Sequence, residues 1–126
     1  VCSNPSIIKE YDADPLCNYV FTANGFRNLF GLMQDCYGAK GWKVSRPQLP
    51  VRFISGAEDP CLISPKAFES AVENMRRVGY KDVSSRLYPG MRHEILNETD
   101  RQTVWDDVVA ASDKIVEGDG IVVEGI

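Results

Sequence analysis

The sequence predicts an α/β fold in which parallel strands alternate with helices in an incomplete sheet. Two short segments rich in β-branched and aromatic residues, 50–55 and 82–88, predict strands. Each is followed by a stretch whose apolar residues recur at the spacing of an amphipathic helix. Apolar residues make up 44% of the 126 residues and charged residues 25%, which suits a single soluble, globular domain or part of one.

The first 37 residues are expected to form one regular helix after an irregular start. The stretch SIIKEYDADPLCNYV is mixed in character and broken by Pro15, so it is predicted to be irregular with room for one short helix. A helix is predicted over residues 22–37, where apolar side chains recur at helical spacing and Gly38 offers a stop. The following segment, GAKGWKVSRPQLP, contains several helix and strand breakers and is predicted to be a loop.

Two strand and helix units follow this loop. The first is strand 50–55, closed by Gly56, and helix 65–78, for which Ser64 is a cap, Pro65 suits the first turn and Gly79 suits the stop. The second is strand 82–88, ended by Pro89, and helix 98–117, with Asn97 as the expected cap. The buried face predicted for this last helix consists of Val104, Val108, Ala111 and Ile115. The tail, 118–126, is predicted to be either a third strand or a frayed end.

This pattern implies a parallel crossover but too few strands for a complete sheet. A strand, a helix and a second strand in this order normally form a right-handed parallel unit. Two parallel strands with unpaired outer edges do not make a stable sheet, because three or more strands with cover on both faces are usually required. The remaining strands are therefore expected to come from elsewhere.

Charge and hydropathy argue against a nucleic-acid-binding protein and against a membrane-spanning one. A net charge of −4 and few clustered basic residues argue against nucleic-acid binding. No apolar run approaches the roughly 20 residues of a membrane-spanning helix, and no signal peptide is recognisable. The chain opens with Val1, which indicates either processing or a piece of a longer protein.

The cysteines indicate a reducing compartment and no metal centre. Four cysteines without a CxxC pair, together with one histidine, make a poor zinc site. Reduced, structural thiols in a cytoplasmic protein are expected, although two disulfides remain an alternative. No metal and no cofactor are predicted.

Two loops at the expected carboxyl ends of the strands contain residues that could take part in catalysis. The stretch SGAEDPCLIS presents Asp59, with Glu58 beside it, and the stretch YPGMRHE presents His93, the single histidine. Because parallel strands end at one edge of a sheet, the carboxylate can accept a hydrogen bond from one imidazole nitrogen and leave the other as a base. This is the orienting half of a Ser-His-Asp triad. The alternative is a polar loop histidine and an Asp-Pro turn without catalytic function.

These stretches also resemble a known family. The strand ending in SGAEDP, the loop LYPGMRHE and the following ILNE are similar to the last two strand and loop units of α/β-hydrolases. The similarity is to the lysophospholipase and monoacylglycerol-lipase-like branch grouped with the serine aminopeptidases, S33. Upstream, YDADPLCNYVFTANGF is similar to the segment that leaves the lid in that family. The resemblance covers about residues 5 to 112 and implies that 1–21 end a lid-like segment and 22–117 form the C-terminal part of the hydrolase fold.

The resemblance implies a role for particular residues. Asp59 would be the triad acid and His93 the general base, in the family's chain order of Ser, Asp and His. Cys61 and Glu94 flank these positions. Phe21, Phe26 and Met91 are candidates for the wall of an acyl pocket, although side chains of these types more often belong to the core.

The nucleophile that the family requires is missing from these residues. No Gly-x-Ser-x-Gly turn occurs in the chain. Cys61 could replace the serine, but it lies in the same loop as the acid and lacks a preformed oxyanion site. The resemblance therefore implies the C-terminal part of a serine hydrolase that cleaves carboxylic esters of the lysophospholipid or monoacylglycerol type, inactive on its own.

Two alternatives belong to other classes of function. One is a non-catalytic module that associates with itself, since an exposed sheet edge is a template for pairing. Under either interpretation a homodimer is expected, through the sheet edge or through a swapped tail from Gly120 onward. The other alternative is a small redox or metal protein built on the four cysteines.

Overall fold

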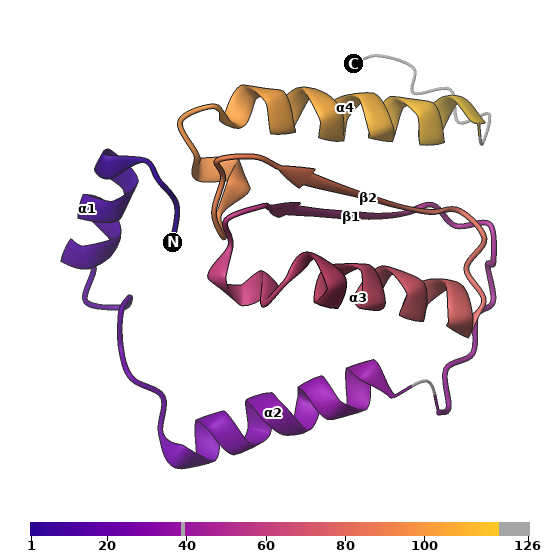
Figure 1. Cartoon of the computed structure of the whole chain (residues 1–126), viewed down its shortest axis with the longest axis horizontal. Helices are drawn as coiled ribbons and strands as arrows, with labels where there is room; N and C mark the ends of the chain where they lie inside the picture. Colours follow the sequence, from indigo (N-terminus) through magenta and orange to yellow (C-terminus); the bar gives the residue numbers. More distant parts are fainter. Residues whose placement is uncertain (39, 119–126) are drawn as a thin grey trace, which may run out of the picture.

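The computed structural model describes residues 1–38 and 40–118. The regular elements are α1 (Pro5–Ala13), α2 (Ala23–Tyr37), β1 (Val51–Gly56), α3 (Pro65–Val78), β2 (Val83–Tyr88) and α4 (Arg101–Gly118), with 3₁₀ turns η1 (Pro60–Leu62) and η2 (Ile95–Asn97). Figure 1 shows them in layers: α4 lies on one side of the two strands, α3 lies on the other side, and α2 lies beyond α3. The helix α1 stands near the end of the strands where the N-terminus also lies.

The two strands pair in parallel, as predicted. Their register runs from Val51 opposite Val83 to Gly56 opposite Tyr88. Within residues 1–38 and 40–118 this pair is the whole sheet, so each strand has a free outer edge. The predicted α/β class with an incomplete sheet is confirmed.

The helix ends follow the signals in the sequence where those signals are strong. The Ser64 hydroxyl accepts a hydrogen bond from the Ala67 N–H at 3.1 Å, which caps α3. At the other end of this helix, Gly79 adopts a positive φ of 124°, a conformation that favours glycine. Thr22 caps α2 in the same manner through the Gly25 N–H.

The start of the last helix differs from the prediction. Residues Ile95–Asn97 form a 3₁₀ turn and α4 begins at Arg101, so Asn97 is not its cap. The side chain of Asn97 instead donates to the Glu94 carboxylate at 2.9 Å. The physical reason lies in Glu98, which stays extended, with φ −67° and ψ 163°, because its buried carboxylate accepts hydrogen bonds from distant backbone.

The predicted buried face of α4 is confirmed only near its start. Val104 is fully buried, Ala111 and Ile115 are half-buried, and Val108 is exposed. The helix is also held to the sheet by the Tyr88 hydroxyl, which donates to Asp107 at 2.8 Å. The predicted strand or frayed end in the tail lies outside the described residues, apart from Gly118, the last residue of α4.

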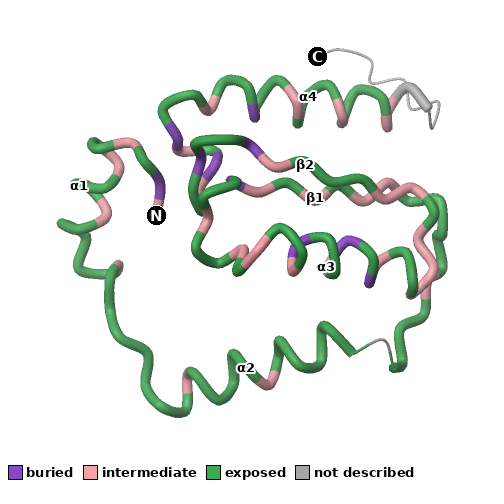
Figure 2. The backbone as a smooth tube through the Cα atoms, viewed as in Figure 1, coloured by how far each residue is buried: buried purple, intermediate pink, exposed green. Residues whose placement is uncertain are grey.

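Burial concentrates at the carboxyl ends of the strands and along α3. One cluster joins the sheet to the start of α4 and consists of Tyr88, Met91, Ile95 and Val104. Figure 2 shows further buried residues on α3 and at the N-terminal segment, whereas α2 has none. None of the helices in residues 1–38 and 40–118 combines the length and the apolar character that spanning a membrane requires.

Candidate active site

The candidate site lies where the two loops leave the carboxyl ends of β1 and β2. Past the end of β1, the Ala57 N–H donates to the Tyr88 carbonyl and the Glu58 N–H to the Met91 carbonyl, both at 2.9 Å. These bonds continue the pairing of the strands into the loops. The loop after β1 and the loop after β2 therefore form one connected structure.

Gly56 allows this close approach. A Cβ atom at this position would lie 2.2 Å from the carbonyl oxygens of Met91 and Arg92, a distance that no side chain can occupy. The absence of a side chain thus lets the loop that contains His93 press against the end of β1. From the sequence, Gly56 is predictable only as the end of the strand, because the approach of residues 91 and 92 has no local signature.

Asp59 and His93 meet directly. The imidazole Nδ1 of His93 lies 2.9 Å from the carboxylate Oδ2 of Asp59, so the predicted contact between the two side chains is confirmed. The Asp59 side chain is 7% exposed and the His93 side chain 57% exposed. This arrangement leaves Nε2 as the ring nitrogen available to exchange a proton.

The environment of Asp59 favours its ionised form. Partial burial by itself raises the pKa of this carboxyl group, but hydrogen bonds from His93, from the Cys61 N–H at 2.8 Å and from Ser55 outweigh it and lower the pKa. Asp59 also caps the turn η1 through the same Cys61 N–H. A carboxylate with a lowered pKa is charged at neutral pH and can stabilise an imidazolium.

The turn that follows Asp59 returns the chain to α3 through strained backbone. Ile63 adopts a φ of 64° and a ψ of −56°, which is unfavourable for a β-branched residue. The Ser64 N–H donates to the Leu62 carbonyl at 2.7 Å and closes a three-residue γ-turn around it. Strain of this kind persists only where the surrounding structure holds the segment.

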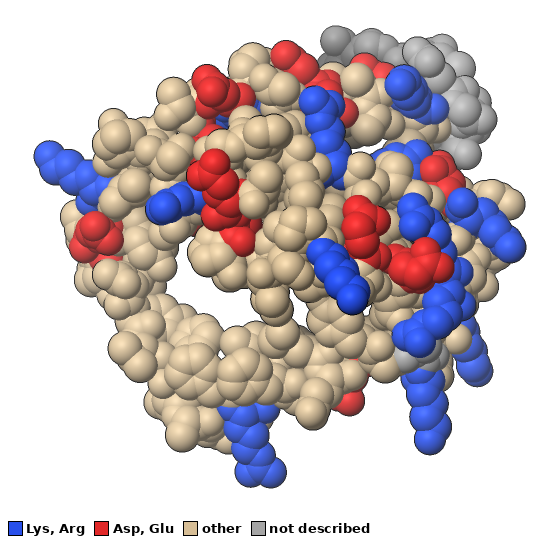
Figure 3. Space-filling view, viewed as in Figure 1, with Lys and Arg blue, Asp and Glu red and all other residues tan. Residues whose placement is uncertain are grey.

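A cavity of about 260 Å³ opens beside Asp59 between α2 and the β1–α3 unit. Its lining is mainly apolar and consists of Met33, Tyr37, Phe53, Ser55, Asp59, Cys61, Leu62, Ile63, Ala67, Phe68 and Ala71. Figure 3 shows an opening between the layer of α2 and the rest of the molecule. Larger cavities of about 440 and 540 Å³ lie against α4, away from His93.

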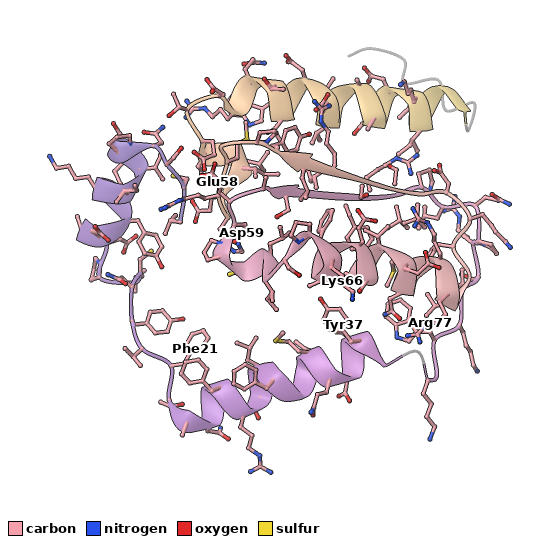
Figure 4. The ribbon with its side chains drawn as sticks, in the orientation of Figure 1. Phe21, Tyr37, Glu58, Asp59, Lys66 and Arg77 are labelled. Atoms are coloured by element: carbon pink, nitrogen blue, oxygen red, sulfur yellow. The ribbon has the colours of Figure 1, made fainter. Side chains whose placement is uncertain are left out.

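The three residues suggested for an acyl-pocket wall do not line this cavity. Phe21 and Phe26 form an edge-to-face pair near the start of α2, with ring centroids 5.5 Å apart, and both are exposed. Met91 is buried in the core cluster, which is the alternative weighed for it. Figure 4 shows Asp59 at the end of β1, with Phe21 just before the start of α2 and Tyr37 at its end.

Cys61 adds a third possible metal ligand to the pair. Ligand atoms of Asp59, Cys61 and His93 all lie within 4.8 Å of one another. Carboxylate, thiolate and imidazole are ligands that Zn²⁺ accepts. Because Asp59 and His93 already bond to each other, a metal ion here would compete with that hydrogen bond. The spacing of the cysteines in the sequence gives no sign of this cluster, because Cys61 belongs to no CxxC pair.

Two comparisons with known proteins bear on the identity of this chain. The family model described as "Serine aminopeptidase, S33" matches residues 1–100. A protein of Mycolicibacterium smegmatis named monoacylglycerol lipase is 29% identical over 111 residues, which are 87% of this chain and 37% of that protein. The chain thus spans little more than a third of the length of this relative.

Proposed function

This chain belongs to the serine aminopeptidase S33 family of hydrolases, and we propose that it provides the acid and the base of a Ser-His-Asp ester hydrolase. Asp59 is the acid in this proposal and His93 the base. The observation that supports it most is the 2.9 Å contact between His93 Nδ1 and Asp59 Oδ2 at the carboxyl ends of two parallel strands. The lowered pKa of Asp59 adds support, because the acid of a triad has to remain charged.

The reaction assigns a step to each nitrogen of His93. Nε2 removes the proton from a serine hydroxyl as its oxygen attacks the ester carbonyl, while Nδ1–H stays bonded to Asp59. Nε2 then gives that proton to the departing alcohol, which leaves an acyl-enzyme. Water, deprotonated by the same nitrogen, attacks the acyl group and releases the carboxylic acid, and the serine recovers its proton.

The serine itself is proposed to lie outside these 126 residues. Because the chain lacks a Gly-x-Ser-x-Gly turn, it has a base with nothing to activate and is expected to be inactive alone. The proposed substrates are carboxylic esters of acyl glycerols or lysophospholipids. The name of the Mycolicibacterium smegmatis relative supports the acyl glycerol class, and the mainly apolar cavity beside Asp59 suits an acyl chain.

A fluorophosphonate probe that labels activated serines tests this proposal. The 126-residue chain is expected to remain unlabelled, whereas a longer protein that includes the preceding part of the family domain is expected to be labelled. Replacement of His93 by Ala in the longer protein should abolish the labelling. Labelling of the short chain, or unchanged labelling of the His93→Ala protein, would contradict the assignment.

A panel of substrates tests the substrate class separately. Monoacylglycerols, lysophospholipids and peptide amides with matched acyl groups would be offered to the labelled, longer protein. Hydrolysis of the two lipid esters at rates well above that of the amides is expected. A preference for amides would retain the triad and overturn the ester assignment.

The free sheet edges favour a second candidate, a module that associates with itself. Both strands have an unpaired outer edge within the described part of the chain, and many large apolar side chains are exposed. Such edges pair readily with another chain, which would give a homodimer. Light scattering at micromolar concentration tests this candidate, because a stable monomer would exclude the module.

A further inference from the structure

Glu98, in the stretch ILNE, has a carboxylate that the proposed reaction does not use. The residue is 1% exposed, and Glu98 is the largest of the fully buried residues in the described part of the molecule. Burying an ionised carboxylate is costly unless it is well hydrogen-bonded. The position of this group therefore requires an explanation.

The two oxygens of Glu98 bind two distant segments of the chain. Oε1 accepts a hydrogen bond from the Arg92 N–H at 2.7 Å. Oε2 accepts from the Ser3 N–H at 2.8 Å and from the Ser3 hydroxyl. One carboxylate thereby joins the N-terminal segment to the loop of His93.

We infer that Glu98 is a positioning residue that fixes the loop of His93 and so holds the imidazole against Asp59. This inference rests on the proposed function, because it concerns the base of that reaction. Glu98 does not touch the reacting atoms. It acts through the backbone of residue 92, next to the base.

The loop is fastened on both sides of His93. Arg92 is bound to Glu98, and the Glu94 N–H donates to the Val1 carbonyl at 3.0 Å. The segment that Glu98 holds through Ser3 is therefore the same one that receives the bond from Glu94. The His93 side chain is largely exposed, so its orientation depends on this backbone rather than on packing around the ring.

Only an ionised carboxylate satisfies all the donors. A Gln side chain at position 98 would place an NH₂ group against either the Arg92 N–H or the Ser3 donors and leave that side without an acceptor. Burial by itself raises the pKa of Glu98, but the bonds from Ser3 and Arg92 outweigh it and lower the pKa. The carboxylate is consequently charged at neutral pH.

The single histidine of the chain makes a direct test possible. In the ¹⁵N-labelled 126-residue chain, a long-range ¹H–¹⁵N spectrum reports the two imidazole nitrogens of His93 without ambiguity. In the wild type we expect Nδ1 to be protonated and Nε2 unprotonated, with shifts distinct from those of the same chain in concentrated urea. Both Glu98→Gln and Glu98→Ala should move these shifts toward the urea values, and Ser3→Ala should move them less.

Glu58→Gln is the matched control. It removes the same charge from an exposed side chain next to Asp59 and is expected to leave the imidazole shifts unchanged. Circular dichroism of each variant verifies folding. Folded Glu98 variants with wild-type imidazole shifts would overturn the inference.

If neither Glu98 variant folds, Ser3→Ala provides the test, since it removes one donor and keeps the carboxylate. A shift of the imidazole signals toward the urea values would support the inference, and wild-type shifts would overturn it. The spectrum also separates this inference from the proposed function. Wild-type shifts equal to the urea values would show that the pair of Asp59 and His93 does not form, which would overturn both. If the pair forms in the wild type and every folded variant keeps the wild-type imidazole shifts, only the role of Glu98 is overturned.

Discussion

Two regions differ in how deeply their side chains are buried. One is the junction, where the N-terminal segment, the loop of His93 and the start of α4 meet, and the other is the helix α2. At the junction, Cys2, Glu98 and Val104 are almost completely buried, and hydrogen bonds connect residues far apart in the sequence. The helix α2 has no buried residue, although its sequence is clearly amphipathic. Its exposed apolar side chains are Phe26, Leu29, Phe30, Leu32, Met33 and Tyr37.

The loops of the site are supported by contacts within this chain, whereas α2 is not. The loops of Asp59 and His93 are held by contacts between described residues of this chain. The apolar face of α2 borders the cavity beside Asp59, but no described residue covers it tightly. Substitutions at the junction should therefore have large effects on the isolated chain, and substitutions on α2 small ones.

The largest expected effect is on catalysis at the junction. In the longer protein that includes the nucleophile, Asp59→Asn should lower kcat by about 10⁴-fold, because an amide neither fixes the same imidazole tautomer nor stabilises the imidazolium. KM should change little. Steady-state kinetics on an ester substrate measures both, and Glu58→Gln, a neighbouring exposed change, serves as the control. A loss below about tenfold would show that Asp59 is not the acid.

The next effect compares one glycine in each region. Gly56→Ala places a methyl group 2.2 Å from two carbonyl oxygens of the His93 loop and should lower the free energy of unfolding by about 3 kcal/mol. Gly31→Ala lies within α2, where an added Cβ meets nothing within 4 Å. It should raise the free energy of unfolding by up to about 1 kcal/mol through helix propensity.

Urea unfolding of both variants measures these changes, with the slope m checked for constancy. The comparison depends on their opposite signs. A neutral Gly56→Ala would show that the two loops are not pressed together as described. A destabilising Gly31→Ala would show that α2 packs closely against something in solution.

The sequence predicted the parts of this molecule whose signals are local. Gly38, Ser64 and Gly79 marked helix ends that the structure has, and the order of strands and helices placed Asp59 and His93 at one edge. The start of α4 was predicted wrongly, because Glu98 is held by Ser3, 95 positions away. Contacts of that kind have no periodicity that a single sequence can reveal. An amphipathic pattern likewise predicts a helix such as α2 without indicating what covers it.

Acid should lower the free energy of unfolding, and Glu98→Gln should remove the part of this pH dependence that comes from Glu98. The pKa of Glu98 is lower in the folded chain than its ordinary value of 4.5, so the unfolded chain binds more protons in acid. The stabilisation is complete above about pH 4.5 and is lost as the pH falls through the folded pKa; Asp59, also lowered, has the same sign. Near neutral pH, Glu98→Gln should cost about 2 kcal/mol.

Urea unfolding at a series of pH values from neutral to acid measures both quantities. The wild type should lose stability more steeply than Glu98→Gln on the acid side, so the two curves should converge there. Parallel curves would show that Glu98 is not bound as an anion in the folded chain. The junction would then be held mainly by its apolar cluster rather than by this carboxylate.

The smallest expected effect is on α2. The Leu32 residue is 62% exposed, and Leu and Ala have similar helix propensities, so Leu32→Ala should change the free energy of unfolding by less than about 0.5 kcal/mol. Val104→Ala, at a fully buried position of α4, should cost about 2 kcal/mol in the same urea experiment. A comparable cost at Leu32 would mean that α2 is covered in solution, and light scattering would then show whether a second copy of the chain covers it.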